Sequence, residues 1–144
     1  MKSMTEKYFL DTNFIVYLFS EDEKEKKKKC HYLFEKLKDE ARLVISTQVL
    51  KEFTAILISK FNLDPIFVKR GIDNLSKLEV VHINTVLIKN AIDIHILNLL
   101  SFWDSLIVSA AKSANCSIIL TENMNDGQVI DGIKIQSPFT FTLQ

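Results

Sequence analysis

The chain has 144 residues, a formal net charge of zero and an apolar fraction of 47%. This length fits a single domain over residues 1–144, and the neutral charge excludes the broad basic field of a non-specific nucleic-acid binder. The apolar runs are too short to cross a bilayer and residues 1–7 lack the apolar run of a secretory signal, so we expect a cytoplasmic protein without membrane association.

The first half of the chain predicts two strands and three helices. Residues 7–10 form a short buried strand, after which Asp11, Thr12 and Asn13 supply helix-start chemistry for an apolar helix through residue 19. Residues 21–37 predict a charged helix whose apolar residues recur at helical spacing. Residues 43–45 predict a second strand, and Ser46 or Thr47 caps a helix that ends near residue 61.

The second half repeats this alternation. Asp64 and Pro65 begin a helix, residues 79–83 form a third strand, and Thr85 caps a helix through residue 98. Ser101 caps a helix over 102–114, which a fourth strand at 117–120 and a short fifth at 132–135 follow. Because apolar strands alternate with helices, we expect an α/β fold with a mainly parallel sheet of four to five strands and helices on both faces.

Four acidic residues lie at the ends of these apolar runs: Asp11 after the first strand, Glu52 and Asp104 near the starts of helices, and Asp126 in the loop after the fourth strand. The carboxyl ends of parallel strands share one edge of a sheet, so Asp11 and the 121–126 loop should lie together there. Carboxylates that meet at one rim repel each other and need protons or a cation. Magnesium, which prefers oxygen ligands, is the natural candidate, and it points to phosphodiester chemistry.

Each acid also has a purely structural explanation. Asp11 fits an N-cap, Asp104 completes a capping-box pattern with Ser101, and Glu52 fits a solvated helix face. The loop residues are typical of a turn. Their convergence favours a metal site, because the partial positive charge of helix N-termini does not cancel several clustered carboxylates.

Other side chains carry weaker signals. The lysine-rich run at 22–29 contains acid-first pairs four residues apart, which favour an exposed helix face over an RNA-binding patch. Cys30 and Cys116 are expected to be buried free thiols. The histidines lack metal-ligand spacing. We expect the larger aromatic residues to pack in the core rather than stack on bases: Phe14, Phe19, Phe34, Phe53 and Trp103.

Several segments together resemble the PIN-domain ribonucleases, and most of all the VapC-type toxins of prokaryotic toxin–antitoxin pairs. The likeness runs from about residue 8 to residue 139. It is carried, in chain order, by Leu10-Asp11-Thr12-Asn13, Lys51-Glu52-Phe53, Phe102-Trp103-Asp104-Ser105-Leu106, Ile119-Leu120-Thr121-Glu122-Asn123-Met124 and the closing segment 127–139.

The resemblance implies a three-layer α/β/α fold, a homodimer and cleavage of single-stranded RNA that depends on Mg²⁺ or Mn²⁺. It implies hydrolysis that leaves a 5′-phosphate and a 3′-hydroxyl. It also implies a small antitoxin whose tail occupies or blocks the acidic pocket. The acidic positions of the family fall on Asp11, Glu52 and Asp104, with Thr12 and Asn13 beside them.

The sequence departs from the family pattern at the last acidic position, which here is Asn123. An asparagine offers the ion a neutral carbonyl oxygen, so we expect Asn123 to be a weaker ligand. We expect Asp126 to supply the missing carboxylate and the Thr121 hydroxyl to hold the loop.

Two alternatives remain open from the sequence. Because Asn123 replaces an acidic residue of the family pattern, the protein could instead be a catalytically weak or inactive domain that binds RNA or protein. A phosphoacceptor domain also places an aspartate at a strand end, but it needs a functional lysine at a late strand end, which the sequence does not show.

Overall fold

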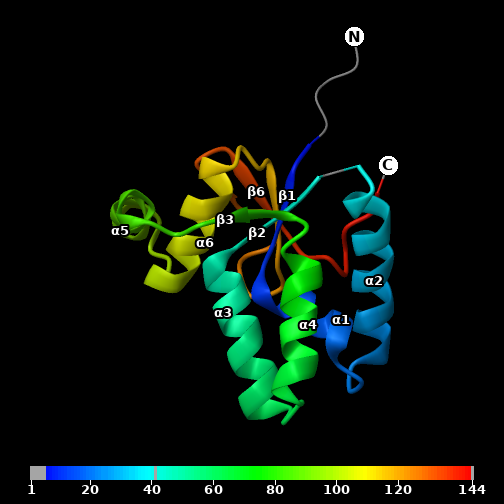
Figure 1. Cartoon of the computed structure of the whole chain (residues 1–144). Coiled ribbons are helices and arrows are strands. Elements are labelled where there is room, and N and C mark those ends of the chain that lie inside the picture. Colours follow the sequence, from blue (N-terminus) through cyan, green and yellow to red (C-terminus); the bar gives the residue numbers. More distant parts are fainter. Residues whose placement is uncertain (1–5, 41, 144) are drawn as a thin grey trace.

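The computed structural model describes residues 6–40 and 42–143. A twisted sheet lies at its centre, with strands in the order β3-β2-β1-β4-β6-β5 (Figure 1). The strands are β1 (Tyr8–Leu10), β2 (Leu43–Ser46), β3 (Glu79–Val81), β4 (Ile118–Leu120), β5 (Val129–Ile130) and β6 (Ile133–Gln136).

Helices follow the strands β1, β2 and β3. The helices are α1 (Thr12–Phe19), α2 (Lys24–Lys38), α3 (Thr47–Ala55), α4 (Pro65–Leu75), α5 (Thr85–Asn98) and α6 (Phe102–Ser113), and a π-helical turn, η1 (Ile56–Lys60), extends α3. In Figure 1, α5 and α6 lie to one side of the sheet and α1 and α2 to the other, with α3 and α4 side by side below. This is the expected α/β architecture with helices on both sides of the sheet.

The central strands are parallel and fully buried. Residues Tyr8 and Phe9 of β1 pair with Leu43 and Val44 of β2, and all three residues of β1 pair with β4. Burial on both faces explains why these strands are continuous apolar runs rather than alternating ones. The parallel register brings the carboxyl ends of β1, β2 and β4 to the same edge.

The main differences from the sequence-based expectation lie near the C-terminus and in α2. The sheet has six strands rather than four to five, because a turn at Asp131 and Gly132 lets β5 pair antiparallel with β6. Both turn residues have positive φ, 51° and 81°, as a tight hairpin requires. Helix α2 begins at Lys24 rather than near residue 21.

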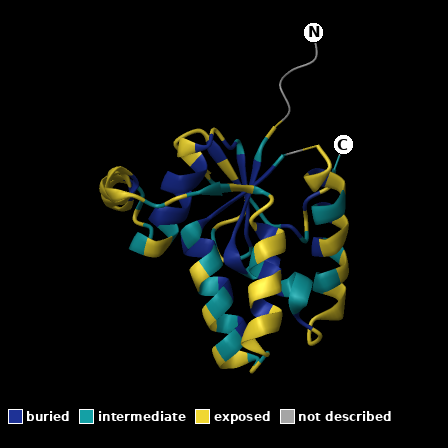
Figure 2. Ribbon diagram, in the orientation of Figure 1, coloured by how far each residue is buried: buried dark blue, intermediate teal, exposed yellow. Residues whose placement is uncertain are grey.

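Helix α5 is unusual because apolar side chains cover much of its solvent face, which is largely exposed (Figure 2). Its inner residues Leu87, Ala91 and Ile94 are buried, whereas the outer ones are exposed: Val86, Ile88, Ile92, Ile96 and Leu97. Among the described residues no single helix has the length and hydropathy to cross a membrane. Helices α5 and α6 meet that test only as a pair, with a bend of 117° between them.

Candidate functional site

A cavity of about 370 Å³ lies where β1 and β4 end and where α1 and α6 begin, with α3 forming another wall. Three carboxylates, from Asp11, Glu52 and Asp104, line it. The other lining residues are Thr12, Asn13, Gln48, Ala55, Ile56, Trp103, Ile107 and Asn123. The structure thus brings together residues that lie up to 112 positions apart in the sequence, as the strand-edge argument predicts.

Asp11 is both a helix cap and a cavity residue. Its Oδ1 accepts a hydrogen bond from the Thr12 backbone N–H at 2.7 Å, and its Oδ2 accepts one from the Thr121 hydroxyl at 2.7 Å. Burial raises the pKa of the Asp11 carboxyl, and these two hydrogen bonds oppose that rise. The negative charges of Glu52 and Asp104 raise its pKa further, so the three acids interact electrostatically.

Glu52 is held by neighbours on two helices. The Thr12 hydroxyl donates to its Oε1 at 2.5 Å, and the Gln48 amide donates to its Oε2 at 3.2 Å. The side chain is half-buried rather than part of a solvated helix face. Its carboxylate is therefore oriented by two donors before any ligand binds.

Asp104 lies in the first turn of α6, which Ser101 caps. The Ser101 Oγ accepts the Asp104 backbone N–H at 3.0 Å, as the capping-box pattern predicts. Burial raises the pKa of the Asp104 carboxyl, contact with Ser101 lowers it and the charge of Glu52 raises it. Like Asp11, Asp104 combines a structural role with a place in the cavity.

The loop after β4 is folded back by Thr121. Its buried hydroxyl accepts the Asn123 backbone N–H at 3.1 Å and donates to Asp11, so one side chain joins the loop to the acid. Asn123 reaches the edge of the cavity. Thr121 therefore holds the loop, as expected from the sequence.

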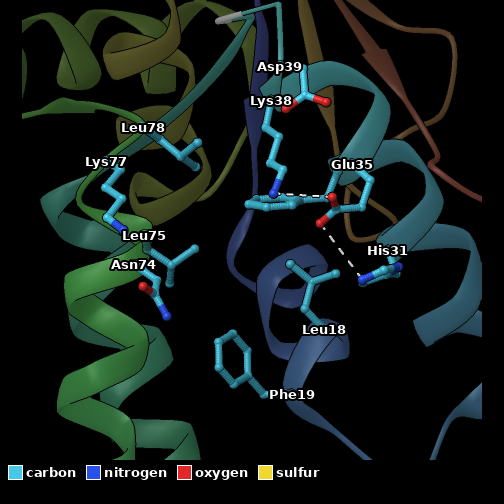
Figure 3. A pocket seen from close by; sticks show the side chains of 11 residues that line it. Leu18, Phe19, His31, Glu35, Lys38, Asp39, Asn74, Leu75, Lys77 and Leu78 are labelled. Carbon is cyan, nitrogen blue, oxygen red and sulfur yellow. Dashed lines mark ion pairs between the residues drawn. The ribbon is translucent and has the colours of Figure 1, made fainter.

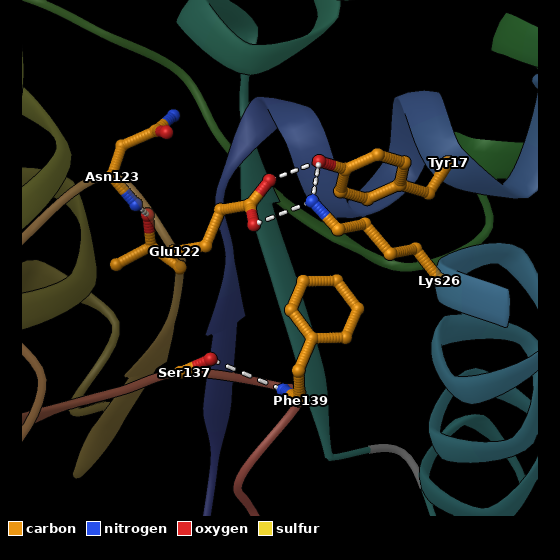
Figure 4. Close-up of polar contacts among 7 residues, drawn as sticks. Tyr17, Lys26, Glu122, Asn123, Ser137 and Phe139 are labelled. Carbon is orange, nitrogen blue, oxygen red and sulfur yellow. Dashed lines mark hydrogen bonds and ion pairs between the residues drawn. The ribbon is translucent and has the colours of Figure 1, made fainter. Parts of the chain in front are cut away.

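Glu122 turns the opposite way, into a cluster that we call the latch: Tyr17, Lys26, Glu122 and Phe139 (Figure 4). Lys26 Nζ lies 3.1 Å from Glu122 Oε2 and 3.3 Å from the Tyr17 hydroxyl, and the Tyr17 hydroxyl donates to Glu122 Oε1. The same ammonium lies 5.2 Å and 5.4 Å from the ring centres of Tyr17 and Phe139. The latch ties the loop to α1, to α2 and to the C-terminal segment.

Asp126 does not line the cavity, contrary to the expectation that it supplies a fourth carboxylate. Its Oδ1 accepts the Ser137 backbone N–H at 2.8 Å and its Oδ2 accepts the Thr140 hydroxyl at 3.3 Å. These bonds tie the carboxylate to the segment after β6 rather than to the cavity. We therefore leave Asp126 out of the candidate site.

The donors in the cavity suit a hard divalent cation, since they are carboxylate and amide oxygens. In the part of the chain that the structure describes, no three acidic, histidine or cysteine side chains converge closely enough to form a ready-made metal cage. The three acids thus line one cavity, but their carboxylates are too far apart to bind one ion as a preformed set. Oxygen ligands from outside the chain would have to complete the coordination.

Among the cavity residues that were not identified from the sequence, Gln48 and Trp103 are the ones with polar or aromatic side chains. Gln48 is buried, donates to Glu52 and to the Trp103 carbonyl oxygen at 3.3 Å, and keeps an Oε1 without a hydrogen-bond partner in the described structure. The sequence does place Gln48 one helical turn before Glu52, and this spacing could have indicated that the two side chains lie on the same face of the helix. Trp103 was expected in the core, yet its side chain is 61% exposed.

A second hollow, of about 550 Å³, lies between α1, α2 and α4 (Figure 3). Its apolar floor comes from Leu18, Phe19, Phe34, Leu75 and Leu78. Charged side chains surround it, including a Glu35 that pairs with Lys38 at 3.1 Å. The hollow lacks a cluster of carboxylates, so its chemistry suits an amphipathic ligand rather than a metal.

The remaining predictions have mixed outcomes. Cys30 and Cys116 are buried free thiols, as expected, and burial raises the pKa of each to about 12. The expected acid–lysine pairs within 22–29 are not the ones that form: Lys26 pairs with Glu122, and Lys27 pairs with Glu21 at 2.8 Å. Residue 22 lies before α2, and the ammonium groups of Lys26 and Lys27 are taken up by Glu122 and Glu21 instead.

Similar folds occur among solved structures of toxin–antitoxin proteins. A toxin–antitoxin complex from Klebsiella pneumoniae matches with a TM-score of 0.69 and 18% identity, over 94% of this chain and 100% of that one. DNA-bound VapBC from Salmonella typhimurium matches with a TM-score of 0.69 and 22% identity, over 93% and 99%. Mycobacterium tuberculosis VapC20, described as a sarcin–ricin loop cleaving toxin, matches with a TM-score of 0.68 and 14% identity, over 89% and 99%.

At these identities the solved structures establish the fold alone. A search of curated proteins finds no match. The sequence itself matches the family model of the PIN domain over residues 8–125, which include β1 to β4 and every residue that lines the acidic cavity. The chain therefore belongs to the PIN-domain family.

Proposed function

We propose that this protein is a metal-dependent endoribonuclease that hydrolyses single-stranded or looped RNA, and that it is the toxin of a toxin–antitoxin pair. The observation that carries the proposal is the convergence of Asp11, Glu52 and Asp104 on one cavity of a PIN-domain chain. The three carboxylates come from three different segments, and local structure alone does not require them to face one another.

The carboxylates of Asp11, Glu52 and Asp104 would hold Mg²⁺ or Mn²⁺, and the Asn123 amide oxygen would be a weaker neutral ligand. When bound, such an ion lowers the pKa of a coordinated water and neutralises charge on the phosphate. The raised pKa values of Asp11 and Asp104 support this assignment, because the protein alone leaves their negative charges poorly compensated.

The surrounding residues place the acids for hydrolysis. Thr121 and the Thr12 backbone N–H fix Asp11, while the Thr12 hydroxyl and Gln48 fix Glu52. Glu52, half-buried and oriented, is the candidate to accept a proton from the attacking water. The water oxygen then bonds to phosphorus and the bond to the 3′-oxygen breaks, which leaves a 5′-phosphate and a 3′-hydroxyl.

The partners follow from two surfaces outside the acidic cavity. We propose that a small antitoxin docks an amphipathic segment in the hollow between α1, α2 and α4 and reaches from there to block the acidic pocket. We propose that the exposed apolar face of α5 pairs with a second copy of the chain to form a homodimer in the cytoplasm. The fold shared with solved toxin–antitoxin complexes supports the antitoxin partner, whereas the homodimer rests on the exposed apolar face of α5.

The test is cleavage of a single-stranded RNA by the purified protein with Mn²⁺, with Mg²⁺ and with an excess of chelator. We expect cleavage with either ion and none with chelator. Asp11→Asn should lose at least 100-fold in rate, a loss on the order of that seen when catalytic electrostatic groups are removed. Asp73→Asn is the matched control, since that aspartate is exposed on α4 and outside the cavity.

The second candidate is a catalytically weak module that binds RNA or protein, and Asn123 in place of an acid favours it. RNA binding without chelator-sensitive cleavage would support it over the nuclease. A phosphoacceptor role is disfavoured, because Asp11 is buried and both of its oxygens accept hydrogen bonds. Labelling with acetyl phosphate tests that role directly.

A further inference from the structure

A groove of about 550 Å³ adjoins the acidic cavity and shares four of its lining residues: Gln48, Glu52, Ala55 and Trp103. The rest of its lining is mostly apolar: Lys51, Ile83, Ile88, Phe102 and Leu106. We propose that this groove is a binding subsite for one unpaired RNA base next to the phosphate in the acidic cavity. The proposal rests on the proposed function and specifies its substrate, an RNA whose base is free to leave the stack.

Trp103 is the side chain on which the base would stack. It is the only tryptophan of the sequence, it is 61% exposed, and it lies directly before Asp104. The Phe102 ring packs edge-on against it, with 5.2 Å between ring centres. An exposed indole that lines both cavities is a platform of the kind that binds unpaired bases, because every base presents a π face to it.

Gln48 adds an unpartnered polar atom at the boundary between the two cavities. Its Nε2 faces the Glu52 carboxylate and the Trp103 carbonyl oxygen, which fixes the amide orientation. Its Oε1 therefore remains a buried acceptor without a donor. Buried acceptors in native proteins are nearly always paired, so this atom points to a donor that a ligand brings, such as a ribose hydroxyl or a base N–H.

Lys51 gives the groove a positive charge. It is exposed on α3 and pairs with no acidic side chain within residues 6–40 and 42–143. A phosphate that flanks the base would find this ammonium in the lining of the groove. The apolar walls suit a planar base, whereas a base held in a duplex could not enter them.

The experiment uses the Asp11→Asn protein with Mg²⁺, so that binding is measured without cleavage. A short single-stranded RNA is titrated while the emission of Trp103, the only indole, is followed. We expect saturable quenching by the RNA and clearly less by an abasic oligomer of the same length and charge. In a parallel anisotropy assay with labelled RNA, Trp103→Ala should weaken binding roughly ten-fold or more, and Trp103→Tyr should largely restore it.

Phe67→Ala is the control variant, because Phe67 is also an exposed aromatic residue but lies on α4, outside the groove. Equal quenching by the abasic oligomer, or unchanged affinity of Trp103→Ala, would overturn the subsite. An emission change on protein dilution without RNA would also overturn it, by assigning the indole to a contact between copies. These readouts do not depend on cleavage, so the subsite and the nuclease can each fail without the other.

Discussion

At the scale of single residues, Asp11 shows a conflict between stability and the proposed activity. Burial raises the pKa of its carboxyl above the ordinary value, and the charges of Glu52 and Asp104 add to that rise. A carboxyl whose folded-state pKa is raised stabilises the fold when it is protonated. That contribution is lost as the pH rises through the folded-state pKa.

The prediction is that Asp11→Asn stabilises the metal-free protein at neutral pH although it removes cleavage. An amide carries no charge to desolvate and can still bond to Thr12 and Thr121. We expect a melting temperature a few degrees higher, the shift that about 1 kcal/mol produces in a domain of roughly this size. The difference should shrink as the pH falls and Asp11 becomes protonated in the unmodified protein. A lower melting temperature for the variant at neutral pH would contradict this account.

Asn123 supplies a second prediction at this scale. It reaches the cavity where the family pattern has an acid, so Asn123→Asp adds a negative charge beside Asp11. We expect Mn²⁺ to bind on the order of ten-fold more tightly, measured by calorimetry on the unliganded protein. Asn125→Asp adds the same charge in the same loop but outside the cavity, and its affinity should stay near that of the unmodified protein. Equal gains in both variants would mean that net charge alone is responsible.

At the scale of elements, the latch joins the loop after β4 to α1 and α2. Its polar contacts join Lys26, Tyr17 and Glu122, and Glu122 is the direct neighbour of Asn123. On the other side of Asn123, the Thr121 hydroxyl ties the loop to Asp11. The latch therefore limits where Asn123 can lie relative to the acids.

Breaking the latch should loosen the site without unfolding the protein. We expect Lys26→Met to speed amide exchange in residues 121–125 and to reduce cleavage by roughly ten- to 100-fold, as with other changes outside the first layer of a metal site. Lys27→Met removes a comparable ion pair, with the exposed Glu21, and should change neither quantity. Unchanged exchange in the Lys26 variant would show that the latch does not restrain the loop.

The strands and helices also show how much of the fold and of the site can be predicted from the sequence. The apolar runs predict the parallel core and its edge, so Asp11, Glu52 and Asp104 were correctly placed in one cavity. The side-chain directions in the loop could not be predicted, because they depend on contacts with distant residues. Asp126 turns to Ser137 and Glu122 turns to Lys26, 96 positions away. Trp103 was wrongly predicted to be buried. It lies in an apolar run, and its exposure depends on how the surrounding elements pack, which the sequence does not show.

At the scale of the whole molecule, the apolar outer face of α5 calls for a partner. Ile96 and Leu97 are 65% and 78% exposed, and Leu99 just after the helix is 93% exposed. Contiguous apolar surface of this kind is characteristic of a contact with another protein. A symmetric contact between two α5 helices would cover the same face on both copies, as a two-fold dimer requires.

The proposed homodimer therefore predicts that Leu97→Asp is monomeric and remains folded. The side chain is exposed, so its replacement should leave the core intact, whereas two buried aspartates facing each other across the interface would repel. Sedimentation velocity gives the mass of each species, and circular dichroism checks the fold. Ile66→Asp is the matched control, since Ile66 is 64% exposed on α4, away from α5, and that variant should remain dimeric. If the unmodified protein sediments as a monomer, or if both variants dissociate equally, α5 is not the contact between copies, and its apolar face must be covered by a different protein.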